Sequence, residues 1–297
     1  MKKILLALMF LFASIAPGEA EVHQQGVVYV VFERTGENAV KADDVNQNSV
    51  PDVVEDIAIQ INAAREVFHD VCGFPDPFKS PRYPNIGTIE VHVLAKANMG
   101  NSNGLAYSGK WTSKDGSGKR ALHIKVAAVV DPRKNSTPAP EYFHLIQYGA
   151  TYFRNSWYLE GMARWSQDSI HAVKKYPTVK SMYMTLNSRL SKAAIFSERY
   201  KAANLLWYPL AVECKDKTEI PSSVMKKYRY ADGTPVFQDD IFYGANVMNK
   251  VLAAMHEKEA VAAAGYADQK TWRKDGVRSD ENNELILECV REVYENY

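Results

Sequence analysis

The sequence predicts an α+β fold, in which a mixed strand-and-helix N-terminal lobe meets an all-helical C-terminal lobe. Strand-like and helix-like segments alternate up to Ser136, and strand-like segments become scarce after it. Two consecutive helices are expected between Thr137 and Asp168, where the lobes meet. Such segregation of strands and helices is typical of the α+β class. We therefore expect an α/β lobe over residues 21–136 and a helical lobe over residues 137–297.

The first twenty residues have the pattern of a secretory signal peptide. Lys2 and Lys3 precede an apolar run, and Gly18 and Ala20 stand at positions −3 and −1 of a cleavage point. The run is too short for a membrane span, and no later stretch is long enough. The sequence thus predicts a signal peptide over 1–20 and an exported protein, periplasmic or extracellular, with no membrane span.

Charge is balanced once this segment is removed. Loss of Lys2, Lys3 and Glu19 from 36 basic and 35 acidic residues leaves 34 of each. A neutral chain argues against nucleic acid or an anionic membrane as the main partner. About 277 residues remain, enough for one large domain or two closely packed lobes.

Three cysteines are too few for a disulfide framework. Export permits one bridge and leaves one thiol free. The sequence alone does not choose the pair among Cys72, Cys214 and Cys289, and a bridge between Cys214 and Cys289 is the preferred expectation.

The N-terminal lobe begins with a buried strand and an amphipathic helix. Gly26 to Glu33 is β-branched and aromatic, as in a buried strand. Pro51 to Val71 has helical periodicity, with Ser49 and Asp52 in a capping-box pattern and Pro51 suited to a first turn. The apolar face predicted for this helix consists of Val53, Val54, Ile57, Ile61, Ala64, Phe68 and Val71.

Further strands follow, and then only helical segments. Thr88 to Leu94 alternates, which predicts a strand with Ile89, Val91 and Val93 inward. A short strand is possible at Leu105–Tyr107, and Ala121–Val130 reads as another strand. The helical segments expected after the central pair are Lys180–Lys192, Glu198–Cys214, Gln238–Ala263 and Glu281–Tyr297.

The central helix pair carries the residues with the clearest chemical potential. Glu141 and His144 are three positions apart, so both project from one face of the first helix. Glu160 lies in the second helix, within the run W-Y-L-E-G-M-A-R-W. In a zincin helix, H-E-x-x-H, two histidines at i and i+4 flank a catalytic glutamate, and a later glutamate completes the zinc site. Here Pro140 occupies the position of the first histidine.

The segments E-Y-F-H-L-I-Q-Y and W-Y-L-E-G-M-A-R-W resemble those of bacterial secreted zinc metallopeptidases of the gluzincin type, whose zinc site is thermolysin-like. Those relatives commonly read H-E-aromatic-aromatic-H with a glutamine soon after, followed by E-G-x-A-x-W. The resemblance covers Ala42 to Asp168. It implies that His144 and Glu160 are zinc ligands and that Glu141 is the base that activates a zinc-bound water. The implied substrate or ligand is a peptide or protein.

Pro140 departs from that pattern, because a pyrrolidine ring cannot bind metal and only two protein ligands remain. His123 or His92 could replace the missing ligand, although no spacing supports either. The alternative is a non-catalytic binding or scaffold protein that keeps the peptidase-like fold and binds a partner in the former active-site cleft. In a purely structural interpretation, His144 is a buried histidine bonded to Glu160, and Glu141 is an acid favoured near the helix N-terminus by the helix dipole. With Pro138, Pro140 belongs in a first turn capped by Thr137.

A second possible metal site precedes the first long helix. Asp44, Asn46, Asn48 and Glu55 fall at positions 1, 3, 5 and 12 of a calcium-binding loop. Ser49 stands where such a loop has glycine, which favours the alternative of an Asx-rich turn that caps the helix.

Overall fold

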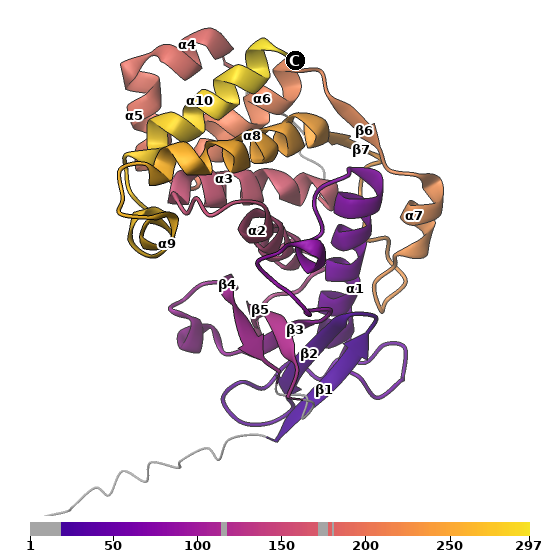
Figure 1. Cartoon of the computed structure of the whole chain (residues 1–297). Helices are drawn as coiled ribbons and strands as arrows, with labels where there is room; N and C mark the ends of the chain where they lie inside the picture. The colour runs from indigo at the N-terminus through magenta and orange to yellow at the C-terminus, as the bar shows by residue number, and fades with distance from the viewer. Residues whose placement is uncertain (1–18, 114–117, 172–177, 180) are drawn as a thin grey trace, which may run out of the picture.

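The computed structural model describes residues 19–113, 118–171, 178–179 and 181–297. A five-stranded sheet forms one layer, and the long helices are stacked against one side of it (Figure 1). The predicted mixture of helices and strands is confirmed, and the sheet is itself mixed in direction. The predicted signal peptide lies outside the described residues except for its last two positions, and Ala20 begins the first strand.

The sheet has the strand order β1-β2-β3-β5-β4. β2, β3 and β5 run parallel to one another, and β1 and β4 join them as antiparallel edges. The four predicted strands are present, the short one is longer than expected, and β1 was not predicted. The strands are β1 (Ala20–Gln25), β2 (Val28–Glu33), β3 (Ile89–Leu94), β4 (Gly104–Thr112) and β5 (Arg120–Ala127).

Both faces of β3 are buried, whereas its alternating pattern predicted one. Ile89, Val91 and Val93 face the helices, as expected. Successive side chains of a strand point to opposite faces, so Glu90 and His92 lie on the far face, yet they are 1% and 8% exposed. Aromatic side chains from β4 cover that face, since the Trp111 indole donates a hydrogen bond to Glu90 Oε1 at 3.0 Å.

The predicted amphipathic helix is α1 (Asp52–Glu66), which continues as a wider π turn, η1 (Val67–Val71). Its predicted apolar face is buried except for the partly exposed Val71. The expected capping box is wrong, because Pro51 is the N-cap residue and no side chain caps the helix. Asp52 is instead fully buried, and its Oδ1 accepts a hydrogen bond from the N–H of Val45 at 2.9 Å.

The C-terminal half is not all-helical, contrary to the prediction. β6 (Lys217–Glu219) and β7 (Ile241–Tyr243) form a small antiparallel sheet, so the helix predicted from Gln238 starts only at Ala245. The helices of this half are α4 (Met182–Asn187), α5 (Arg189–Ser197), α6 (Tyr208–Glu213), α7 (Ser222–Lys227), α8 (Ala245–Ala263), α9 (Gln269–Thr271) and α10 (Asn282–Glu295), with π turns η5 (Ala203–Trp207) and η6 (Trp272–Gly276). Lys180, the first residue of another predicted helix, lies outside the described residues.

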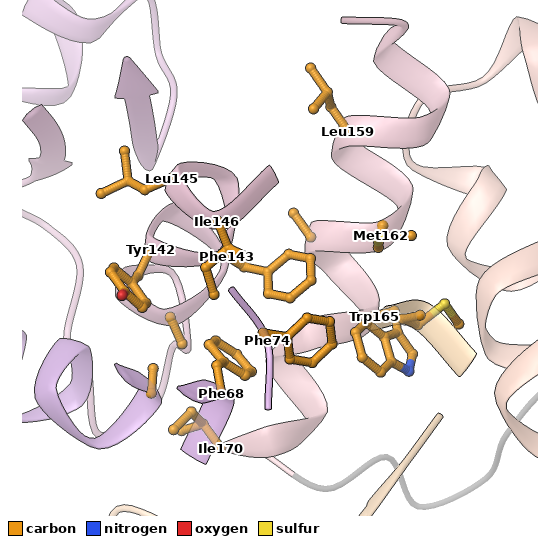
Figure 2. Packing of buried hydrophobic residues seen from close by; sticks show 14 of the residues in the cluster. Phe68, Phe74, Tyr142, Phe143, Leu145, Ile146, Leu159, Met162, Trp165 and Ile170 are labelled. Atoms are coloured by element: carbon orange, nitrogen blue, oxygen red, sulfur yellow. The ribbon is translucent and has the colours of Figure 1, made fainter. Parts of the chain in front are cut away.

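One hydrophobic core joins the two halves. Phe68 of η1 packs edge-on against Phe143, with ring centroids 5.2 Å apart, and Phe143 packs against Trp165 at 5.8 Å (Figure 2). Trp165 stacks in turn on Phe242 of β7 at 4.7 Å. These contacts run from the sheet-covering helix through the central pair to the C-terminal half. The division into lobes over 21–136 and 137–297 stays a prediction.

All three cysteines are free thiols, so the expected bridge between Cys214 and Cys289 is not formed. Burial raises the pKa of each thiol, that of Cys72 included, to about 12. Thiolates are the reactive species, so the raised pKa values disfavour reaction of these thiols at neutral pH. Among the described residues, no helix has both the length and the apolarity needed to cross a membrane.

A buried acid on α1 makes the stability of the fold depend on pH. Asp56 is fully buried, and burial raises the pKa of its carboxyl to about 7, despite a 2.8 Å hydrogen bond from the N–H of Ala231. The folded state therefore favours the protonated acid. Its contribution to stability is present below the unfolded pKa of 3.8 and is lost as the pH rises toward 7.

Asp56→Asn is expected to stabilise the protein at pH 8 by on the order of 2 kcal/mol, with a gain that shrinks toward pH 4. The amide oxygen can still accept the bond from Ala231 while the charge is gone. Urea unfolding at several pH values measures this difference. Asp232→Asn is the matched control, and it should destabilise the protein at pH 8. Partial burial raises the pKa of Asp232, but bonds from Thr234 and Arg133 outweigh it and lower the pKa. A gain for Asp56→Asn that does not vary with pH would contradict the prediction.

Candidate functional site

The two predicted central helices are present as α2 (Pro138–Ala150) and α3 (Ser156–Ser166). Pro138 takes the first position of α2, where its missing N–H costs nothing. Thr137 is the N-cap residue, as expected, but it does not cap with its side chain, because its hydroxyl donates to Asn135 Oδ1 at 2.6 Å. α2 packs between α1, α3 and the edge strand β4.

His144 is buried and held in one tautomer. Its Nδ1 lies 2.8 Å from Oε1 of Gln147, whose Nε2 donates to the carbonyl of Leu159 at 3.3 Å. Because that donation leaves Oε1 as the acceptor, Nδ1 carries the proton and Nε2 presents a lone pair. Burial lowers the pKa of His144, which keeps the imidazole neutral.

The free lone pair of His144 faces Glu160. Nε2 lies 3.8 Å from Glu160 Oε2, beyond hydrogen-bonding distance. The alternative in which His144 is hydrogen-bonded to Glu160 is therefore not observed, and Gln147 is its hydrogen-bonding partner. A neutral imidazole oriented by a second side chain, beside a carboxylate, is the arrangement of a histidine that ligates metal.

Glu141 also lies in this site, against the edge strand. The N–H of Ala106 donates a hydrogen bond to its carboxyl group, and a Cβ added to Gly104 would lie 2.4 Å from its Oε1. Burial, and then the charge of Glu160, raise the pKa of Glu141 to about 8. The group is therefore largely protonated at pH 7. A protonated carboxyl group cannot serve as a general base, so the raised pKa disfavours that role at neutral pH, and base catalysis by Glu141 stays a prediction.

Glu160 is held at the site by close packing on the neighbouring residue. A Cβ at Gly161 would lie 2.6 Å from the indole nitrogen of Trp207, so the helix can approach η5 this closely only with glycine there. The Glu160 side chain is 31% exposed, and its charge contributes, after burial, to the raised pKa of Tyr200. Sequence reasoning missed Tyr200 and Ala106, because both reach the site from segments distant along the chain.

The proposed replacement ligands are not in the site. His92 and His123 lie on the far face of the sheet, with ring centroids 4.9 Å apart. His92 Nε2 is 2.5 Å from Glu90, and the His123 ring stacks between Tyr107 and Trp111. The sheet itself separates them from His144, so neither can supply a third ligand.

A catalytic zinc ion does not fit this donor set. His144 and Glu160 offer two ligand atoms, whereas catalytic zinc sites use three protein ligands. Within residues 19–113, 118–171, 178–179 and 181–297, no group of three or more His, Cys, Asp or Glu side chains is arranged to hold a metal ion. Pro140 is the position that leaves the set incomplete.

The four residues of the suspected calcium loop are brought together. Asp44 accepts hydrogen bonds from the N–H groups of Asn48 and Ser49 at 3.1 and 2.9 Å. Glu55 accepts bonds from the side-chain amides of Asn46 and Asn48 at 2.9 and 2.7 Å. Calcium needs oxygen ligands, but here amide nitrogens face the carboxylate. These contacts are those of an Asx-rich turn, and calcium binding stays a prediction.

Ser49 adopts the backbone conformation that glycine has in a calcium loop, with φ at 71°. The sequence alone could not show that the turn forms without glycine. The turn does not cap α1 through a side chain, which corrects that part of the Asx-turn interpretation.

Comparison with protein-family models, with curated proteins and with solved structures finds no match for this chain. The resemblance to gluzincin-type peptidases therefore stays a prediction.

Proposed function

We propose that this protein binds an extended peptide along β4, beside α2, and that it does so without a catalytic zinc ion. The observation that carries the proposal is the position of β4. It is an edge strand, and its Gly104–Ala106 end runs next to Glu141 of α2. An edge strand presents backbone donors and acceptors to which an extended peptide can add as a further strand.

The hydrogen-bonding direction of β4 supports this mode of binding. Ala127 N–H donates to the carbonyl of Asn103 at 2.8 Å, so Asn103 and, by alternation, Leu105 face β5. Gly104 and Ala106 then direct their backbone groups away from β5, in agreement with the bond from Ala106 to Glu141. A peptide on this edge would compete with Glu141 for one N–H group.

The incomplete donor set supports the second half of the proposal. With Pro140 in place of a ligand, the zinc donor set is one residue short, and the raised pKa of Glu141, about 8, disfavours the carboxylate that a general base needs. Under this proposal the edge of β4 binds a peptide, and the residues beside it lack the complete zinc ligand set that hydrolysis would need.

Ala106→Pro tests the binding mode. It removes the N–H that points away from β5 and leaves the bonds to β5 in place, and proline is tolerated on edge strands at such positions. We expect it to weaken binding of fluorescein-labelled, randomised, N-acetylated decapeptides by about tenfold or more in an anisotropy titration. Ala106→Val is the matched control, because it adds bulk at the same place and keeps the N–H.

Equal binding by Ala106→Pro and the wild type would refute the edge-strand mode, and no binding by the wild type would refute the proposal as a whole. Mass spectrometry of the same peptides after incubation with zinc is expected to find them intact.

A zinc peptidase is the second candidate, favoured by the lone pair of His144 Nε2 facing Glu160 at 3.8 Å. Elemental analysis of the purified protein distinguishes the two. Near-stoichiometric zinc in the wild type that is lost in Glu160→Ala would favour the enzyme. Absence of zinc from a folded protein would favour peptide binding.

We further propose that the protein is exported and acts in a periplasmic or extracellular setting. The N-terminal sequence pattern alone supports this. Cleavage after Ala20 would remove a single residue of β1, which leaves its pairing with β2 nearly intact. N-terminal sequencing of the protein recovered outside the cytoplasm should begin at Glu21.

A further inference from the structure

A large cavity lies at the other end of α2 from Glu141. Its volume is about 720 Å³, and it is lined by the 73–82 segment, the end of α2, α8 and Arg273 of η6. Gly149 lines it, eight residues beyond Glu141, which is roughly 12 Å along the helix. The cavity is therefore distinct from the site proposed to bind peptide. Its size is in the range of small-molecule sites.

Two guanidinium groups meet at one aromatic ring in the cavity wall. The Arg82 guanidinium carbon lies 3.7 Å and that of Arg273 4.1 Å from the centre of the Tyr152 ring. Arg82 is fixed in place, because its Nη1 donates to the carbonyls of Tyr148 and Thr151. Cation–π contacts orient both groups but do not neutralise their charge.

Neither guanidinium has a carboxylate within ion-pair distance among the described residues. The acids that line the cavity are engaged elsewhere. Glu259 is buried and accepts the N–H of Tyr152 at 2.7 Å. Asp76 accepts the N–H of Phe78 at 2.9 Å. Burial lowers the pKa of Arg82, whereas the nearby Glu259 raises it and Arg273 lowers it again.

The net charge of the residues that line the cavity, and their apolar members, indicate which kind of ligand fits. Lys79, Arg82 and Arg273 outnumber Asp76 and Glu259 by one positive charge. A ligand with one negative charge restores neutrality. The lining also has apolar residues, namely Leu252 and Ala253 of α8 together with Pro75 and Pro81.

We propose that this cavity binds an apolar carboxylic acid as its monoanion, with the carboxylate at Arg82 and Arg273 and the apolar group against α8. Arginine presents a planar fork of donors that matches a carboxylate, and Leu252 removes the apolar group from water. Such a carboxylate is provided either by a free small acid or by the C-terminus of a peptide.

Isothermal titration calorimetry with hexanoate and with hexanamide tests the charge requirement. We expect the wild type to bind hexanoate at least about tenfold more tightly than hexanamide, because only the acid forms charge-assisted bonds. Arg273→Gln, which changes an exposed side chain, should weaken hexanoate binding by about tenfold. Equal affinity for hexanoate and hexanamide would overturn the proposal, and so would a failure to bind both hexanoate and N-acetyl-leucine.

Ala253→Trp tests the location. Ala253 is an exposed residue of α8 on the cavity wall, so an indole there fills the space and should abolish binding. Ala260→Trp is the matched control on the same helix, because Ala260 is exposed and does not line the cavity. Retention of hexanoate binding in Ala253→Trp would overturn the assignment of the site.

N-acetyl-leucine and N-acetyl-leucinamide distinguish the two sources of the carboxylate. Tighter binding of N-acetyl-leucine than of hexanoate would indicate a peptide C-terminus, and the reverse order would indicate a small free acid. Either order supports the proposal if the corresponding amide loses affinity.

Discussion

Replacing Pro140 with histidine is expected to turn this chain into a zinc-binding protein. Positions 140 and 144 are one turn apart on α2, so the new imidazole would project from the same face as His144. With Glu160 it would complete the three protein ligands that a catalytic zinc site needs. We expect the zinc content of purified Pro140→His to rise to about one ion per chain.

The substitution should be tolerated by the helix. Position 140 lies in the first turn of α2, where a proline is accepted but not required, so its loss should cost under about 1 kcal/mol. Saturating zinc at about a hundred times the dissociation constant should then stabilise the variant by about 2.7 kcal/mol, measured by thermal unfolding with and without zinc.

Pro140→Ala is the matched control. It removes the ring without adding a ligand, so it should bind no zinc and should show no zinc-dependent change in stability. A Pro140→His protein that is well folded and still takes up no zinc would mean that the His144–Glu160 pair, 3.8 Å apart, is not preserved as a metal site.

Of the substitutions proposed for this protein, Trp165→Ala is expected to lower the free energy of unfolding most, by about 3–5 kcal/mol. The Trp165 side chain is fully buried, stacks on Phe242 at 4.7 Å and packs against Phe143 and Phe74 (Figure 2). Its indole N–H donates to the carbonyl of Tyr243 at 2.9 Å. Truncation opens a cavity between the central helices and β7, and total stabilities are only about 5–15 kcal/mol.

Urea unfolding followed by circular dichroism measures this loss. Trp165→Phe is the control, because it keeps an aromatic ring on Phe242 and gives up only the N–H and part of the volume. We expect its cost to be about half that of the alanine variant. A loss below about 1 kcal/mol for Trp165→Ala would show that the packing seen between the two halves contributes little to folding.

The fold was predictable wherever burial follows a local period. The 3.6-residue pattern of α1 and the apolar run of β2 correctly predicted a helix and a strand. In both, the residues that become buried form a recognisable pattern of apolar side chains in the sequence. β6 and β7 carry no such mark. Each has three residues and is defined by its partner, so the prediction of an all-helical half failed there.

The site was predictable to the same extent. Glu141 and His144 share a face of one helix, which their spacing alone determines. Their partners are set by tertiary structure. Gln147 rather than Glu160 bonds His144, and Ala106 of the edge strand bonds Glu141 and lies beside it. Burial there raises the pKa of Glu141, and no local pattern records burial by another segment.

The sequence by itself determined the helix pair, the shared face of Glu141 and His144, and the proline that replaces a ligand. Only the tertiary structure decided that His92 and His123 lie behind the sheet, and that Arg82 and Arg273 meet at Tyr152 in a cavity. The physical reason is that a residue's neighbours along a helix follow from its number, whereas its neighbours across the core depend on how distant segments pack.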